Sequence, residues 1–151
     1  MREIQRKVNN LKKKYNTSCP FEICDKMGIN IFYFDLPNCV NGLFFKYFRN
    51  YIIIVNSELC YEDCRVTVAH ELGHIFLHNT TNSFQLTVNT DIPIQRLENE
   101  ADYFASCLLI DENEIRSEYC GCSLTVRDIA CISKLPESMV KLYANTNGYL
   151  N

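Results

Sequence analysis

Two histidines and a glutamate are spaced for metal chemistry near the middle of this 151-residue chain, where residues 70–74 read HELGH. If the segment is helical, His70 and His74 project from the same face about one turn apart, because four residues rotate a helix by about 400°. Both rings can then share one metal ion. Glu71 lies about 100° around the helix from His70, where it can reach a water at the metal without being a ligand. In a shuffled chain of this composition the pattern would occur about 0.004 times, so chance explains it poorly.

Zinc suits the two imidazoles, and catalytic zinc usually has three protein ligands and one open position. A helix expected after Pro93 offers Glu98 and Glu100 as the third ligand. These two residues lie about 200° apart around the helix, so only one of them can face the histidines. Asp102 follows Glu98 by four residues and could accept the second ring N–H of a ligating histidine. We therefore prefer Glu98 as the ligand with Asp102 behind it, and Glu100 as the alternative ligand or as a solvated residue near a helix start.

This set of groups predicts metal-assisted hydrolysis of a peptide bond. Zinc would acidify a bound water and polarise the scissile carbonyl, while Glu71 would take the proton and pass it to the leaving amine. The sequence does not identify the residue that helps to stabilise the oxyanion. His78 continues the four-residue spacing, but we expect this histidine at the helix end to interact with the terminal carbonyls. Tyr103 and the polar segment 79–91 stay open as candidates.

The chain resembles the ImmA/IrrE metallopeptidases, a family of zincins whose third ligand is a glutamate. The resemblance is carried by VAHELGHIFLH at residues 68–78 and by ENEADYFA at 98–105, followed by two leucines. It also covers the layout before the motif, which is a short helix, aromatic strands and a strand ending at residues 54–56. The chain departs from the family in having Ile110 where a proline commonly follows the leucines.

The resemblance implies zinc at His70, His74 and Glu98, with Glu71 as the catalytic carboxylate. It also implies a protein substrate, since members of the family cleave helix-turn-helix repressors of mobile elements or act in stress responses by that route. One alternative is a metal-containing protein that binds a regulator without cutting it. Another is a helix-turn-helix DNA-binding protein, with residues 137–144 as the recognition helix, although that segment carries little positive charge.

The rest of the chain must position these residues, and its patterns predict an α+β fold of the minimal zincin type. Apolar spacing predicts helices over residues 2–15, 20–28 and 58–78, and aromatic or β-branched runs predict strands at 30–36, 43–48 and 51–55. The last two strands should form a hairpin in a small antiparallel or mixed three-stranded sheet. Beyond the motif we expect a short strand at 84–88 and helices from Pro93 to Ile110, from Asp111 to a break at Gly121, over 124–133 and over 137–144.

Composition narrows the class of protein. Apolar residues make up 47% of the chain, and the net charge is −3. No run of uncharged apolar residues is long enough to cross a membrane. We expect one cytoplasmic domain, with a catalytic core over about residues 1–115 and a helical appendage over about 116–151. A generally basic nucleic-acid binder is disfavoured. The nine cysteines, an odd number without a C-x-x-C pair, indicate reduced thiols, although Cys60 with Cys64 or Cys120 with Cys122 could form a second site.

Overall fold

The computed structural model describes residues 1–78, 94–118 and 124–148, except for the side chains of Arg116 and Glu118. The N-terminal helices are α1 (Arg2–Tyr15) and α2 (Pro20–Met27), both within the predicted ranges. Helix α1 buries one apolar stripe, consisting of Ile4, Val8 and Leu11. Gly28 ends α2 with a left-handed φ of 69°, a conformation that glycine adopts without steric cost.

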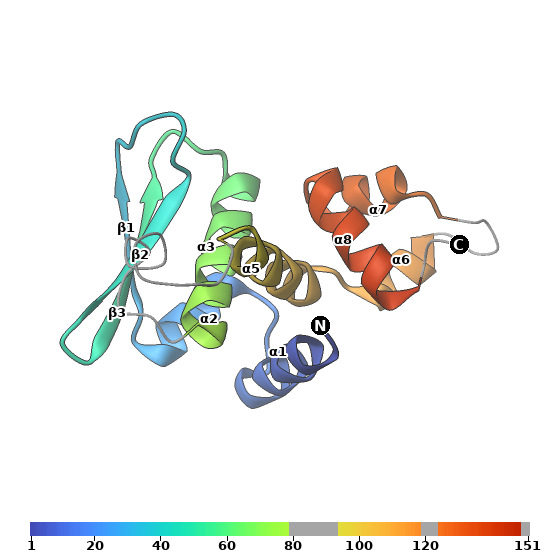
Figure 1. The fold of residues 1–151 in the computed structure, drawn as a ribbon, viewed down its shortest axis with the longest axis horizontal. Coiled ribbons are helices and arrows are strands. Elements are labelled where there is room, and N and C mark those ends of the chain that lie inside the picture. The colour runs from blue at the N-terminus through green and yellow to red at the C-terminus, as the bar shows by residue number, and fades with distance from the viewer. Residues whose placement is uncertain (79–93, 119–123, 149–151) are drawn as a thin grey trace.

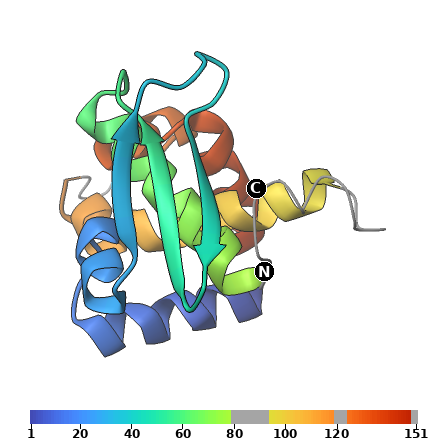
Figure 2. The ribbon, with the colours of Figure 1, turned by 90° about the vertical axis from the view of Figure 1, so that its left-hand side faces the viewer.

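The three predicted strands form one mixed sheet. They are β1 (Asn30–Phe34), β2 (Gly42–Tyr47) and β3 (Asn50–Asn56), in the order β1-β3-β2. Strands β2 and β3 form the expected antiparallel hairpin, whereas β1 runs parallel to β3. Ile31 and Phe44 both pair with Ile53, so their side chains share one face of the sheet. That face turns toward the helices, and Phe44 and Ile53 are buried there (Figure 2).

Helix α3 (Tyr61–Leu77) carries the HELGH motif and packs against the buried face of the sheet (Figure 1). The predicted start at residue 58 is wrong by three positions. Asn56 explains the difference, because its side-chain amide donates to the carbonyls of Leu36 and Val40 while its side-chain oxygen accepts from the backbone N–H of Glu58. These bonds hold the chain in a turn, and the helix begins only after Cys60.

Helix α5 (Ile94–Leu109) lies across α3 on the side away from the sheet (Figure 1). The two helices meet where Gly73 faces Ala101. A Cβ atom added at Gly73 would lie 2.9 Å from the Cα of Ala101, so the backbones approach too closely for a larger residue. The close approach brings the acidic residues of α5 beside the histidines of α3.

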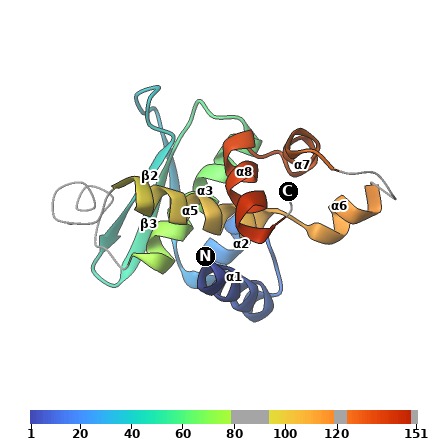
Figure 3. The same ribbon diagram turned by 45° about the vertical axis from the view of Figure 1, so that its right-hand side comes forward.

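The C-terminal helices are α6 (Glu112–Glu118), α7 (Val126–Ser133) and α8 (Glu137–Asn147). Asp111 accepts hydrogen bonds from the first turn of α6, as its position predicts. Helix α8 runs beyond the predicted end at residue 144 and packs across the C-terminal part of α5 (Figure 3). The predicted strand at 84–88 and the break at Gly121 lie outside the described residues. None of the described helices is both long and apolar enough to cross a membrane.

Candidate metal centre

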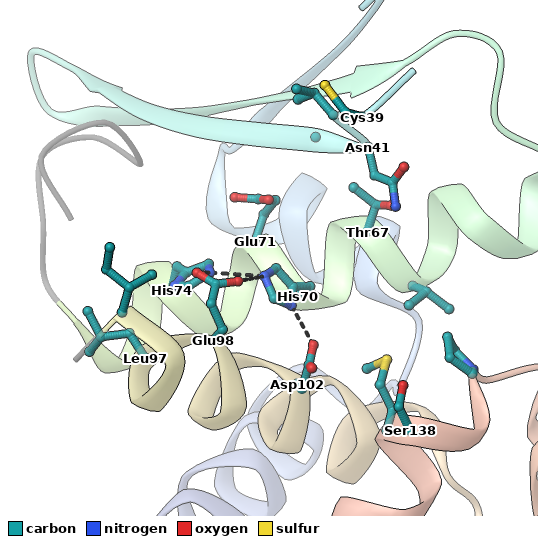
Figure 4. A pocket seen from close by; sticks show the side chains of 16 residues that line it. Cys39, Asn41, Thr67, His70, Glu71, His74, Leu97, Glu98, Asp102 and Ser138 are labelled. Carbon is teal, nitrogen blue, oxygen red and sulfur yellow. Dashed lines mark hydrogen bonds and ion pairs between the residues drawn. The ribbon is translucent and has the colours of Figure 1, made fainter. Parts of the chain in front are cut away.

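The two histidines of α3 point the same ring nitrogen toward each other and toward α5. Their Nε2 atoms lie 3.0 Å apart. Glu98 reaches both rings from α5, with 3.3 Å from its Oε2 to Nε2 of His70 and 3.5 Å from its Oε1 to Nε2 of His74. One ligand atom from each of the three residues lies within 4.8 Å of the others (Figure 4). The structure therefore brings together two nitrogens and a carboxylate that could hold one metal ion.

Asp102 lies behind His70, where the sequence places it. Its Oδ1 is 2.9 Å from Nδ1 of His70, the nitrogen that faces away from Glu98 (Figure 4). Burial of the His70 ring opposes its protonation, but hydrogen bonds to Asp102 and Glu98 outweigh the burial and raise the pKa of His70 to about 10. The surroundings of this ring thus favour positive charge, and a bound divalent cation would satisfy the same preference.

Glu71 lies on the strand side of the histidines, opposite Glu98 (Figure 4). Its side chain is buried, and its Oε2 has no hydrogen-bond partner among the residues that the structure describes. Burial raises the pKa of this carboxyl group. A buried carboxylate oxygen without a partner is costly, which makes this oxygen a natural acceptor for a water beside the metal.

The donor set fits zinc. Two imidazole nitrogens and one carboxylate are ligands that catalytic zinc commonly has, and such a set leaves a position open. Hydrogen bonds with His70 and His74 lower the pKa of Glu98, so this carboxylate is ionised, as a ligand must be. The unpartnered oxygen of Glu71 beside this set agrees with the same assignment.

Two residues lie differently from the sequence prediction. Glu100 points away from the cluster and places Oε2 3.3 Å from Nε2 of His78, so it is neither at the candidate metal position nor simply solvated. The side chain of His78 contacts Glu100 and also Nδ1 of His74 at 3.0 Å, rather than the helix carbonyls that we expected. The contact between His74 and His78 could have been predicted from their four-residue spacing, since residues four apart are neighbours on a helix.

A cleft of about 460 Å³ contains the cluster. One wall includes Asn41, just before β2, and the opposite wall includes Ser138 of α8 (Figure 4). Gly42 and Met139 also line the cleft. Tyr103 is not part of this lining. It is fully buried, and its hydroxyl donates to the side chain of Asn147, which leaves it unsuited to act on a substrate. The other candidate for oxyanion stabilisation, segment 79–91, lies outside the described residues.

The cysteines that the structure describes are free thiols. Burial raises the pKa of Cys24 to about 12 and that of Cys107 to about 11, which makes both thiols unreactive near neutral pH. The thiol of Cys60 donates to the carboxylate of Asp63, and that of Cys64 donates to the carbonyl of Leu59. Each thiol of this pair thus has a hydrogen-bond partner of its own. Cys120 and Cys122 lie outside the described residues.

Comparison with known proteins agrees with this geometry. Residues 24–120 match the IrrE N-terminal-like domain, a peptidase family. A protein named Metallopeptidase ImmA from Bacillus subtilis (strain 168) is 35% identical over 111 residues, which cover 72% of this chain and 64% of that protein. The chain belongs to the ImmA/IrrE metallopeptidase family. A second relative, from Bacillus phage phi105, is named uncharacterized immunity region protein 2. It is 34% identical over 140 residues, which cover 92% of this chain and 87% of the phage protein.

Proposed function

We propose that this protein is a zinc-dependent endopeptidase that cleaves a cytoplasmic regulatory protein, with a helix-turn-helix repressor of a mobile element or stress response as the substrate class. The convergence of His70, His74 and Glu98 beside the unpartnered carboxylate oxygen of Glu71 carries the proposal. Membership of the metallopeptidase family supports the reaction, and the name of the phage relative supports a role in an immunity region. The free thiols of the described cysteines agree with a reducing compartment.

The residues divide the reaction among them. His70, His74 and Glu98 would hold zinc, and Asp102 would keep the His70 ring oriented through its Nδ1. Bound there, zinc supplies a Lewis acid that lowers the pKa of water to about 7 and polarises a carbonyl. Glu71 takes the proton of the attacking water on its free Oε2 and delivers it to the amine of the leaving peptide. Burial favours this role, because a raised pKa makes the carboxylate a better base.

The sheet offers a docking edge for the peptide. Strand β2 is paired on one side only, with β3, so its other edge is open among the described residues. Asn41 and Gly42, where β2 begins, line the same cleft as the histidines. An extended peptide that paired with this edge would lie across the cluster, and backbone hydrogen bonds of this kind give affinity with little dependence on sequence.

We propose that residues 1–151 act as one metallopeptidase domain. The core over about residues 1–115 carries every residue of the proposed zinc site. The helical appendage over about 116–151 supplies Pro136, Ser138 and Met139 to the cleft wall. This placement favours a part in substrate binding for the start of α8, rather than insertion of α8 into DNA.

Replacement of Glu71 by Gln tests the proposed function. The variant keeps the shape of the side chain but cannot accept a proton, so we expect it to bind zinc as the native protein does and to lose turnover. Native protein and Glu71→Gln are produced in matched bacterial cultures, and the new protein N-termini that appear are compared by N-terminal labelling and mass spectrometry.

New N-termini in a transcriptional regulator, seen with the native protein alone, would support the peptidase. Equal cleavage by both proteins would remove Glu71 from the reaction. If both proteins relieved a regulator equally without new N-termini, the non-catalytic alternative would replace the proposal.

A further inference from the structure

His78 lies between a proposed zinc ligand and a carboxylate of the neighbouring helix. It follows the last turn of α3, and its side chain is only 5% exposed. Its Nδ1 is 3.0 Å from Nδ1 of His74, and its Nε2 is 3.3 Å from Oε2 of Glu100. Glu100 is fixed in turn by Arg96, whose Nε donates to Oε1 at 2.9 Å. A continuous chain of contacts therefore runs from His74 through His78 and Glu100 to Arg96.

The chemistry of imidazole sets the direction of these hydrogen bonds. His74 directs Nε2 toward His70 and Glu98, so a metal held there would use the lone pair of this nitrogen. A neutral ring that ligates through Nε2 carries its proton on Nδ1. The Nδ1–H of His74 must then donate to Nδ1 of His78, which accepts only if its own proton is on Nε2. That Nε2–H points at Glu100, which completes the chain with a donor and an acceptor at every step.

The two histidines of the motif are thus supported by different means. Asp102 contacts His70 directly, at 2.9 Å. His74 has no carboxylate at its Nδ1 among the described contacts, and the ring of His78 occupies that place. Glu100 acts on His74 only through this intervening ring. The three carboxylates of α5 thus differ in their contacts: Glu98 contacts both histidines of the motif, Asp102 contacts His70, and Glu100 contacts His78.

We propose that His78 is a positioning residue that accepts the Nδ1–H of His74, a proposed zinc ligand. The hydrogen bond that His78 donates to Glu100 makes its Nδ1 a stronger acceptor for His74. The inference rests on the metal site of the proposed function and adds a residue to it. Such partners orient a ligating histidine and raise its basicity, and their loss typically weakens metal binding by about 10- to 100-fold.

Paired substitutions at position 78 separate the hydrogen bond from simple filling of space. His78→Leu puts an apolar side chain of similar size in place of the ring and leaves no acceptor for His74. His78→Asn places an oxygen on the same Cγ that bears Nδ1 in histidine, so it can still accept. Glu100→Gln weakens the hydrogen bond at the other end of this series of contacts. Asn99→Ala is a control on the same helix, because the amide oxygen of Asn99 accepts only from Gln95 among the described contacts.

The first readout is the zinc dissociation constant, measured by competition with a chromophoric chelator. We expect zinc binding to weaken by about 10- to 100-fold in His78→Leu, to be largely restored in His78→Asn and to be unchanged in Asn99→Ala. Glu100→Gln should fall between the native protein and His78→Leu. Equal affinity of the native protein and His78→Leu would overturn the role of His78 while leaving the zinc site intact. A native protein that binds no zinc would overturn the proposed function and this role with it.

The second readout needs no substitution. Nitrogen-15 NMR of the zinc-loaded native protein distinguishes the two neutral forms of each histidine ring. We expect the proton of His74 on Nδ1, protected from exchange with water, and the proton of His78 on Nε2. A proton on Nδ1 of His78 would overturn the proposal whatever the variants do, because that ring could not accept from His74.

Discussion

Glu98 and Glu100 are two residues apart on α5 but have different partners. Glu98 contacts the Nε2 atoms of both motif histidines, whereas Glu100 contacts His78 and Arg96. The rotation of about 200° between them around the helix explains the division, because only one face of α5 is turned toward the cluster. A difference in metal binding between variants of these two residues therefore tests which carboxylate is the ligand.

We expect Glu98→Ala to abolish stable zinc binding and Glu100→Ala to preserve it in weakened form. Loss of Glu98 removes one of the three proposed ligands, but loss of Glu100 removes only the proposed support behind His78. Elemental analysis after dialysis without chelator, followed by zinc titration, should give about one zinc per chain for the native protein and for titrated Glu100→Ala. Zinc retained by Glu98→Ala and lost by Glu100→Ala would reverse the assignment.

At this scale the sequence predicted the convergent residues and the contact of Asp102 with His70, but not the contacts of His78. The spacing of His70 and His74 and the four-residue step from Glu98 to Asp102 are local properties of a helix, so they can be read without a structure. The contact between His78 and Glu100 joins the end of α3 to the second turn of α5. It depends on how the two helices cross, which no local pattern determines.

At the scale of elements, α3 and α5 fix the cluster by their close approach. Gly73 faces the backbone of Ala101, and one turn before Ala101 on the same helix lies Glu98. Any displacement of α5 away from α3 would therefore carry the third proposed ligand away from the histidines. The small size of Gly73 is a requirement of the site as well as of the core.

We expect Gly73→Ala to lower both the free energy of unfolding and the affinity for zinc. The new methyl group would lie 2.9 Å from the Cα of Ala101, and backbone cannot yield as a flexible side chain can. Overpacking of this kind costs about 1–3 kcal/mol, which exceeds the helix propensity of about 1 kcal/mol that alanine gains over glycine. Urea denaturation and chelator competition measure the two effects. Unchanged values in both would show that α5 can shift without disturbing the cluster.

The order and pairing of the elements were predicted less completely than the elements themselves. Two neighbouring aromatic and β-branched runs predicted the hairpin of β2 and β3, whose partners are adjacent in the sequence. The parallel pairing of β1 with β3 joins segments separated by the whole of β2, and the sequence left the sheet as antiparallel or mixed. The late start of α3 has the same origin, because the carbonyls that hold Asn56 lie 16 and 20 residues before it.

At the scale of the whole molecule, Arg65 connects the motif helix to the C-terminal helices. One guanidinium nitrogen donates to the carbonyl of Ser133 at the end of α7, and the other donates to the carbonyl of Leu109 at the end of α5. The hydroxyl of Ser106 in α5 lies between two carbonyl oxygens, 2.8 Å from that of Asp102 in its own helix and 3.3 Å from that of Met139 in α8. The appendage is thus tied to the core by hydrogen bonds as well as by apolar packing.

We expect Arg65→Met to lower the free energy of unfolding by about 1–3 kcal/mol, because two carbonyls at helix ends lose a charged donor. Arg127→Met is the matched control, since Arg127 is 88% exposed and pairs on the surface with Glu137. Its loss should change stability by less than about 1 kcal/mol. Thermal and urea unfolding of both variants provide the comparison. Similar losses of stability in the two variants would argue against a special role for Arg65 in joining the helices.

The start of α8 forms one wall of the cleft, so a change there should affect substrate binding without touching the proposed zinc site. Ser138 lines the cleft and is exposed, whereas Asn145 is exposed on the same helix and is not part of the lining. We expect Ser138→Tyr to lower kcat/KM for the protein substrate by about tenfold or more, because a bulky ring displaces the peptide from its reactive alignment. Asn145→Tyr should leave kcat/KM unchanged, and both variants should keep native zinc affinity. If Ser138→Tyr cleaved as fast as the native protein, the substrate would not cross this wall, and the appendage would serve only to complete the core.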